Sequence, residues 1–350
     1  MMSARPAGEL AGLTGLRGIA AMTVFIAHGR FYELVPSLKP PLVFFEWHSL
    51  AVDLFFMLSG FVLLHVYAAK FASGRRGLWK PYYAARFARI VPLYLATLLA
   101  SLGIFIAGSI VVGRWPANLT WPVVMTNLLL LQGWPGLFQM SINIPSWSLS
   151  VEVFCYIAVM PLALFLHRRM SRGWSIPLII LLLVSWRIHL PIADSGWIGL
   201  LRGVTGFLIG ALLHQFHLFT SNKTVIATTT AAAVLFLVLQ SLVAWGGLTA
   251  FLPVFTFPFL IQGLASPVRS VVHDFFRSPF MLWLGDLSYS IYLWQGPVYL
   301  ATHTVIRPHL VAMPVSARLA WILFEFTFIL GLSHLSYHRL ELPMRRWLRS

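Results

Sequence analysis

The chain has 350 residues, of which 59% are hydrophobic and only 10% are charged. Soluble domains carry about 25% charged residues, so the composition argues against a soluble globular protein and indicates a polytopic, all-α membrane protein. The net charge of +15 would suit a nucleic-acid-binding protein, but the distribution of that charge argues against nucleic acid as a partner.

About ten apolar stretches approach the length that a helix needs to cross a bilayer. They cover residues 13–31, 49–69, 89–111, 147–166, 176–189, 197–216, 225–244, 248–264, 280–305 and 317–338. The stretch 121–132 is too short and is expected to be re-entrant or interfacial. No hydrophilic stretch is long enough for a separate soluble domain. Residues 1–350 are therefore expected to form one integral membrane domain.

The basic residues are unevenly divided between the two sides of the predicted bundle. With a cytoplasmic N-terminus, seventeen of the Lys and Arg residues fall in inner segments and six fall in outer segments. Cytoplasmic loops of membrane proteins carry this excess. The count predicts that both termini are cytoplasmic. It also explains the net positive charge as the usual charge pattern of a membrane protein.

The first apolar stretch contains two ionisable residues, Arg17 and His28. An ionisable side chain at bilayer depth is costly, so it usually faces a protein interior or a wet cavity and has a function. Eleven residues of helix separate the two by roughly 16 Å and leave them on one face. A helix here would present a fixed cation near one membrane surface and a titratable imidazole about three turns deeper.

Two carboxylates are predicted to lie near the depth of His28. Glu152 follows a polar run at an outer helix start, and Asp53 lies about one turn into the second span. A buried carboxylate needs a partner or a raised pKa. Either side chain could orient the His28 imidazole. No pair of histidines has the His-Glu-x-x-His spacing of a helical metal site, so no metal is expected.

Arg86 and Arg89 form a second candidate site at an inner helix start. Their i, i+3 spacing places both guanidinium groups on one face of a helix. Arginine binds phosphate oxygens in a bidentate manner and keeps its charge at any physiological pH. The pair could therefore bind a phosphorylated molecule, and an equally good interpretation is contact with lipid headgroups.

Several motifs together resemble the acyltransferase-3 family of integral membrane acyltransferases. They are Leu13-Thr14-Gly15-Leu16-Arg17 running to His28, Val52-Asp53-Leu54-Phe55-Phe56, Arg86-Phe87-Ala88-Arg89-Ile90-Val91-Pro92, Trp147-Ser148-Leu149-Ser150-Val151-Glu152 and Leu284-Gly285-Asp286-Leu287-Ser288-Tyr289 continuing to Trp294. Each motif is weak alone, but their order and their spread over nearly the whole chain make the set specific.

The resemblance implies an acyl-CoA donor on the cytoplasmic side and a hydroxyl acceptor, often on the far side. It implies that Arg17 and His28 are needed for activity and that Arg86 and Arg89 help to hold the donor. The chain departs from the family pattern at two positions. Val153 stands where many members have a second carboxylate, and Gln295 stands where many have histidine.

The sequence thus predicts a membrane O-acyltransferase that moves an acyl group, expected to be acetyl, from acyl-CoA to a hydroxyl. The expected acceptor is a sugar of an envelope or exopolysaccharide, or its lipid-linked precursor, and the expected location is a bacterial inner membrane. His28 would act as general base or as a covalent nucleophile, two roles that the sequence does not separate. A transporter or flippase for a glycolipid or acyl substrate is the alternative.

Overall fold

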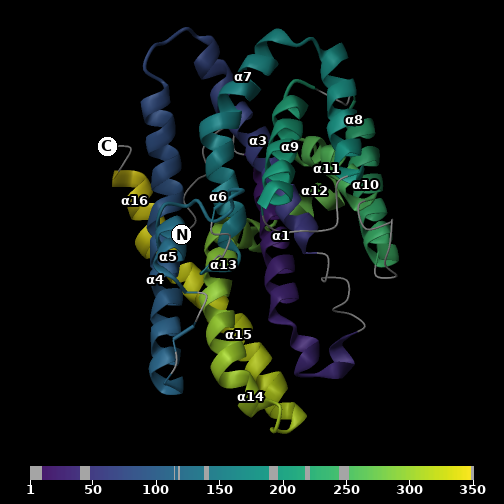
Figure 1. Cartoon of the computed structure of the whole chain (residues 1–350). Helices are drawn as coiled ribbons and strands as arrows, with labels where there is room; N and C mark the ends of the chain where they lie inside the picture. Colours follow the sequence, from purple (N-terminus) through teal and green to yellow (C-terminus); the bar gives the residue numbers. More distant parts are fainter. Residues whose placement is uncertain are drawn as a thin grey trace.

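The computed structural model describes residues 10–39, 48–113, 115–116, 119–137, 142–188, 196–216, 221–243 and 252–347. Within these residues the secondary structure is helical and no strand occurs, which confirms the predicted all-α polytopic bundle (Figure 1). The long helices are α1 (Ala11–Gly29), α3 (Ser49–Ala72), α4 (Trp79–Val112), α8 (Arg172–Ile188), α9 (Gly196–Leu213), α10 (Asn222–Val243), α13 (Pro279–Ala301) and α15 (Val315–Ser336).

Shorter helices complete the bundle. They are α5 (Trp121–Leu128), α6 (Ser146–Phe154), α7 (Met160–Arg169), α11 (Phe257–Ala265), α12 (Val271–Phe276), α14 (Arg307–Leu310) and α16 (Leu342–Trp347). Three π-helical segments join consecutive α-helices: η4 (Cys155–Val159) links α6 to α7, η6 (Thr302–Ile306) links α13 to α14, and η7 (Tyr337–Glu341) links α15 to α16. A π-helical turn changes the face on which the following side chains lie and is frequent at functional sites.

Seven helical segments of the described chain are long and apolar enough to cross a membrane. They correspond to seven of the ten predicted spans. Helix α13 is long but carries several polar residues, and α8 and α11 are shorter apolar helices. The stretch predicted to be re-entrant or interfacial contains the short helix α5. Residues 189, 244 and 248–251 of the predicted spans, and both predicted cytoplasmic termini, lie outside the described residues.

Helix α4 begins ten residues before the predicted span, at Trp79. Arg86 and Arg89 therefore lie about two turns inside a helix and not at its start, which corrects the predicted boundary. The 34 residues of α4 correspond to about 51 Å of helix, more than the roughly 30 Å of hydrocarbon. The helix thus extends beyond a bilayer and can carry these two arginines near its surface.

Two close helix pairs build the centre of the bundle: α1 packs along α13, and α3 packs along α9. A Cβ added to Gly285 would collide with the carbonyl oxygen of Thr14. A Cβ added to Gly210 would collide with the carbonyl oxygen of Met57. Small residues allow membrane helices to approach this closely. The pairs hold Arg17, on α1, and Asp53, on α3, against fixed neighbours.

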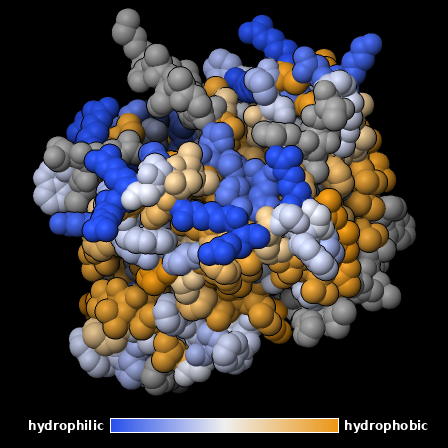
Figure 2. Space-filling view, turned by 90° about the horizontal axis from the view of Figure 1, so that it is seen from above, coloured by the Kyte–Doolittle hydropathy of each residue, from blue (hydrophilic) through white to orange (hydrophobic). Residues whose placement is uncertain are grey.

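The two ends of the bundle differ in character. Helices α3 and α4 are connected at the upper end of Figure 1, where α7 and α8 also meet, while α14 lies at the lower end. Seen from above in Figure 2, hydrophilic residues gather on the upper face and hydrophobic residues dominate the visible sides. Exposed apolar side chains on α10 and α15, such as Leu235 and Phe324, are suited to lipid contact.

Candidate active site

A cavity of about 130 Å³ lies among α1, α3, α4, α6 and α13. The charged and polar residues that line it include Arg17, Arg86, Arg89, Glu152, Ser288 and Tyr292. The structure therefore brings the three arginines predicted to hold the donor into one cavity, although α1 and α4 are far apart in the sequence.

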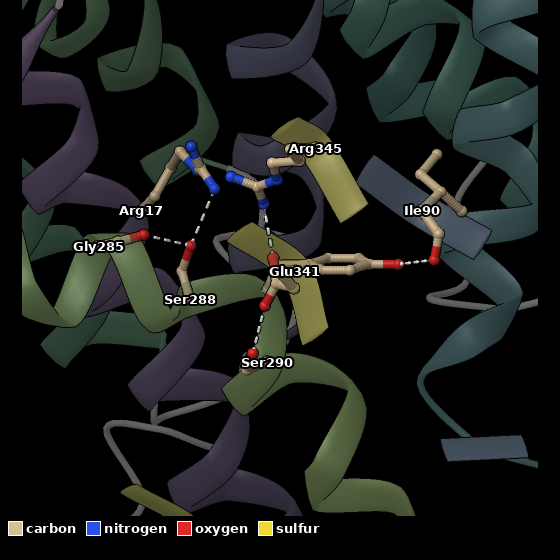
Figure 3. A network of polar contacts seen from close by, with 8 residues as sticks. Arg17, Ile90, Gly285, Ser288, Ser290, Glu341 and Arg345 are labelled. Atoms are coloured by element: carbon tan, nitrogen blue, oxygen red, sulfur yellow. Dashed lines mark hydrogen bonds and ion pairs between the residues drawn. The ribbon is translucent and has the colours of Figure 1, made fainter. Parts of the chain in front are cut away.

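Arg17 is held against α13 by a serine of the Gly285-Asp286-Leu287-Ser288 motif. Its Nη2 donates to Ser288 Oγ at 3.0 Å, and that hydroxyl donates to the carbonyl oxygen of Gly285 at 2.7 Å (Figure 3). Because the Ser288 proton is used on the carbonyl, its oxygen is oriented to accept from Arg17. A guanidinium group carries further N–H donors, which are available to a ligand of the cavity.

Arg86 lies between two tyrosine rings. Its guanidinium carbon is 5.9 Å from the centroid of Tyr67 and 5.8 Å from that of Tyr156, within the range of cation–π attraction. Its Nε atom is buried and has no hydrogen-bond partner in the structure. Buried donors are almost always paired in folded proteins. An unpaired guanidinium N–H beside a cavity is therefore suited to an anionic ligand.

Glu152 also lines this cavity, at the end of α6 that precedes the π-helix η4. Its Oε1 accepts hydrogen bonds from the hydroxyls of Ser59 and Tyr156, both at 2.5 Å. The Tyr156 ring is the one beside Arg86. Glu152 is thus connected to the arginines, and its predicted role in orienting His28 stays a prediction.

His28 lies in the last turn of α1, on the helix predicted to carry it together with Arg17. Its Nδ1 is 3.4 Å from Oε1 of Gln295, and its ring centroid is 4.5 Å from that of His48. His28 is not among the residues that line the cavity. Tyr292 bridges the two regions, since it lines the cavity and its backbone contacts Gln295.

The hydrogen bonds of Gln295 determine which nitrogen of His28 carries a proton in the neutral ring. Gln295 Nε2 donates to the carbonyl oxygen of Tyr292 at 2.9 Å, so its Oε1 faces His28. An amide oxygen can only accept, so this contact favours the tautomer with the proton on Nδ1. This assignment leaves Nε2 of His28 with the lone pair that a general base requires.

Asp53 is engaged in a buried ion pair with Arg202 of α9. The Arg202 Nε lies 2.9 Å from Asp53 Oδ1, with 2% and 4% of the two side chains exposed. Arg202 Nη2 also donates to the carbonyl oxygen of Ser49 at 2.9 Å. The pair ties α3 to α9. The prediction that Asp53 orients His28 is untested, but this geometry gives Asp53 a structural role.

Sequence reasoning missed several polar residues that contact the predicted ones. Ser59, Tyr156 and Ser288 are hydroxyl residues inside apolar helices, and such residues give little signal on their own. Arg202 gave a stronger signal, because a charge within an apolar stretch needs a partner. That signal does not name the partner, which lies 149 positions away.

A family model of an acyltransferase domain matches residues 10–337. The chain belongs to the acyltransferase-3 family. Because this match covers nearly the whole chain, it confirms the resemblance seen in the motifs. It also confirms the predicted enzyme class, an acyltransferase, at the level of this domain. Together with the apolar helices it identifies an integral membrane protein.

Two curated proteins share part of the sequence. Acyltransferase MdmB of Streptomyces mycarofaciens is 36% identical over 156 residues, which are 43% of this chain and 38% of that protein. Protein 2 in picA locus of Rhizobium radiobacter is 35% identical over 171 residues, 43% of this chain and 81% of that protein. The similarity thus spans well under half the length of the first relative. No solved structure matches the chain significantly.

Proposed function

We propose that this protein transfers a short acyl group, in the simplest case acetyl, from acyl-CoA to a hydroxyl group of an envelope saccharide or its lipid-linked precursor. The observation that carries the proposal is the cavity lined by Arg17, Arg86 and Arg89, with His28 about three turns farther along α1 from Arg17. Three arginines suit a polyphosphorylated donor, because guanidinium groups bind phosphate oxygens strongly. A bacterial inner membrane is the proposed location.

The donor would enter with its phosphates on the arginines and its pantetheine arm directed toward Tyr292 and His28. Pantetheine is long and largely uncharged, so it can occupy a cavity whose walls include Phe55, Val62 and Leu63. Glu152 orders Tyr156 through a hydrogen bond, and Tyr156 in turn flanks Arg86. Glu152 is therefore proposed as a positioning residue for the phosphate site.

His28 would act on the acceptor hydroxyl. Its Nε2 removes the hydroxyl proton while the oxygen attacks the carbonyl carbon of the thioester. The carbon–sulfur bond then breaks, and the proton held by His28 passes to the departing thiolate. Gln295 stabilises the required tautomer through Nδ1. In the covalent variant of this mechanism, Nε2 itself attacks the thioester carbonyl and the carbon–sulfur bond breaks, so that CoA leaves as the thiolate. The acceptor oxygen then attacks the acyl-imidazole, the acyl–nitrogen bond breaks, and the hydroxyl proton neutralises the thiolate.

Donor binding can be measured directly by calorimetry with CoA and the purified protein in nanodiscs. Replacement of both Arg86 and Arg89 by Ala is expected to weaken CoA binding at least tenfold. Lys at either position should rescue binding only partly, since it lacks the bidentate geometry. Arg75→Ala, in the exposed segment between α3 and α4, is the matched control and should bind CoA normally.

If the Arg86→Ala/Arg89→Ala protein binds CoA as tightly as the wild type does, the two arginines serve another purpose, such as contact with lipid headgroups, and the proposed donor site is wrong. Transfer itself is tested with labelled acetyl-CoA and an extract of envelope glycolipids and polysaccharides. Label that stays in CoA, with no glycan product, would contradict the proposed acceptor class.

A further inference from the structure

Arg345, on the C-terminal helix α16, lies beside the arginine cavity without being one of the residues that line it. Figure 3 shows its guanidinium group next to that of Arg17, although the two residues are on opposite ends of the chain. The charges of Arg17 and Arg345 are close enough to repel each other, and both also repel Arg89. The C-terminal segment therefore adds a cation to those of α1 and α4.

A buried carboxylate holds Arg345 in this place. Arg345 Nη2 lies 2.5 Å from Oε2 of Glu341, whose side chain is 1% exposed. The other carboxylate oxygen of Glu341 accepts a hydrogen bond from Ser290 of α13 (Figure 3). Glu341 is the last residue of the π-helix η7. The π-helical turn changes the face on which side chains lie, and Glu341 points toward Ser290 of α13 while it holds Arg345.

Positive charge is concentrated around Arg17. Arg89 and Arg345 both lie close enough to repel it, and Glu152 attracts it. Glu341 is already paired with Arg345. Like charges in a partly buried site destabilise one another unless an anion lies between them.

The donor atoms of Arg345 are not all used either. Its Nε is buried and has no hydrogen-bond partner in the structure, which is also true of Arg86 Nε. A buried N–H without a partner is costly, and each such group in a native structure calls for an explanation. A bound phosphate would give such a nitrogen atom a partner and would relieve the repulsion among Arg17, Arg89 and Arg345.

We infer that Arg345 is a further phosphate-binding residue of the donor site and that Glu341 is the residue that positions it. The inference rests on the proposed function and deepens it, because it makes the C-terminal helix part of the site that binds the nucleotide end of CoA. Arg345 lies beside the cavity and not in its lining. Its guanidinium group lies next to that of Arg17, so it is expected to contact a phosphate bound there and to leave the thioester end untouched.

The test compares CoA binding by variants in nanodiscs made only of zwitterionic lipid. Removing Arg345 alone would leave Glu341 buried and unpaired, so the informative variant is Arg345→Ala combined with Glu341→Gln, which keeps a hydrogen-bonding group for Ser290. This double variant is expected to bind CoA at least tenfold more weakly, and Arg345→Lys should show a smaller loss. The control is Arg346→Ala, which removes an exposed charge from the same helix and should bind CoA normally.

Truncated ligands separate a phosphate contact from a general disturbance of the fold. The double variant should bind a truncated ligand as tightly as the wild type does once the phosphate that Arg345 contacts is missing. That ligand is dephospho-CoA if Arg345 contacts the 3′-phosphate, and pantetheine if it contacts the diphosphate. An equal loss of affinity for every ligand, pantetheine included, would overturn the inference. So would unchanged CoA binding, or an effect seen only when anionic lipid is added, which would make a lipid headgroup the ligand.

The result also distinguishes this inference from the proposed function. If the Arg86→Ala/Arg89→Ala protein loses CoA binding and the Arg345 variants keep it, the donor site stands and the role of Arg345 is wrong. If the wild type does not bind CoA at all, the proposed donor fails.

Discussion

His28 is the residue on which the proposed chemistry depends. We expect His28→Ala to lower acyl transfer by about 10²–10⁴-fold, the usual contribution of a general base, or to abolish it if the imidazole is acylated. CoA affinity should change less than about twofold, because the arginines bind the donor phosphates and His28 lies outside the cavity lining. The measurements are transfer of labelled acetyl and calorimetry on the same preparation.

An exposed histidine on another helix provides the control for that variant. His334 is exposed near the end of α15, where it contacts Trp283, and His334→Ala should transfer acetyl normally. Wild-type turnover in the His28→Ala protein would rule out both the base and the nucleophile roles.

At the scale of single residues, the sequence predicted those relations that follow from the periodicity of one helix. Arg17 and His28 share α1 as expected, and Arg86 and Arg89, which were predicted to share a helix face, both line one cavity. The sequence did not predict the contacts that cross between helices. The Gln295–His28 contact joins residues 267 positions apart, and no local pattern shows which helix will lie against which.

Individual helices are fixed by buried polar pairs as much as by apolar packing, and the Asp53–Arg202 pair between α3 and α9 is the clearest case. Asp53→Ala should destabilise the protein by about 3–5 kcal/mol, since it leaves a buried guanidinium without its counter-ion. Replacing both residues by Leu should cost much less, because well-packed apolar groups can replace a buried ion pair. Thermal unfolding of the detergent-solubilised variants measures the difference in stability.

The same two variants test the catalytic role that the sequence suggested for Asp53. If the pair only connects α3 to α9, the double Leu variant should keep most of its acyl transfer. If Asp53 orients His28, both variants should lose transfer, whatever their stability. Lost transfer in a double variant that remains stable would therefore contradict a purely structural role for Asp53 and would support the catalytic one.

Helix boundaries were harder to predict than the existence of helices. The charged segment before residue 89 hid the true start of α4, because its polar residues break the apolar pattern although the helix continues through them. The π-helices η4 and η7 also could not be predicted from the sequence. Their effect is a change of face, which becomes visible only through contacts such as Ser290 with Glu341.

The α3–α4 connection lies at the upper end of the molecule in Figure 1, and hydrophilic residues gather on that face in Figure 2. The excess of Lys and Arg predicts that this end is cytoplasmic. Under the proposed function, the arginine cavity would take acyl-CoA from that side, and His28 lies near the other end of α1. Phosphates cannot cross hydrocarbon, so they would stay with the arginines while the thioester reaches inward.

This arrangement predicts transfer across the membrane, which sealed vesicles of known orientation test most directly. Labelled acetyl-CoA is supplied on the side of the α3–α4 connection, and a membrane-impermeant hydroxyl acceptor is supplied on the other side. We expect the acceptor to be acetylated by the wild-type protein, and transfer to be lost with His28→Ala and with Arg86→Ala/Arg89→Ala. Transfer only when donor and acceptor are on the same side would contradict the account and would place the whole reaction at one mouth of the bundle.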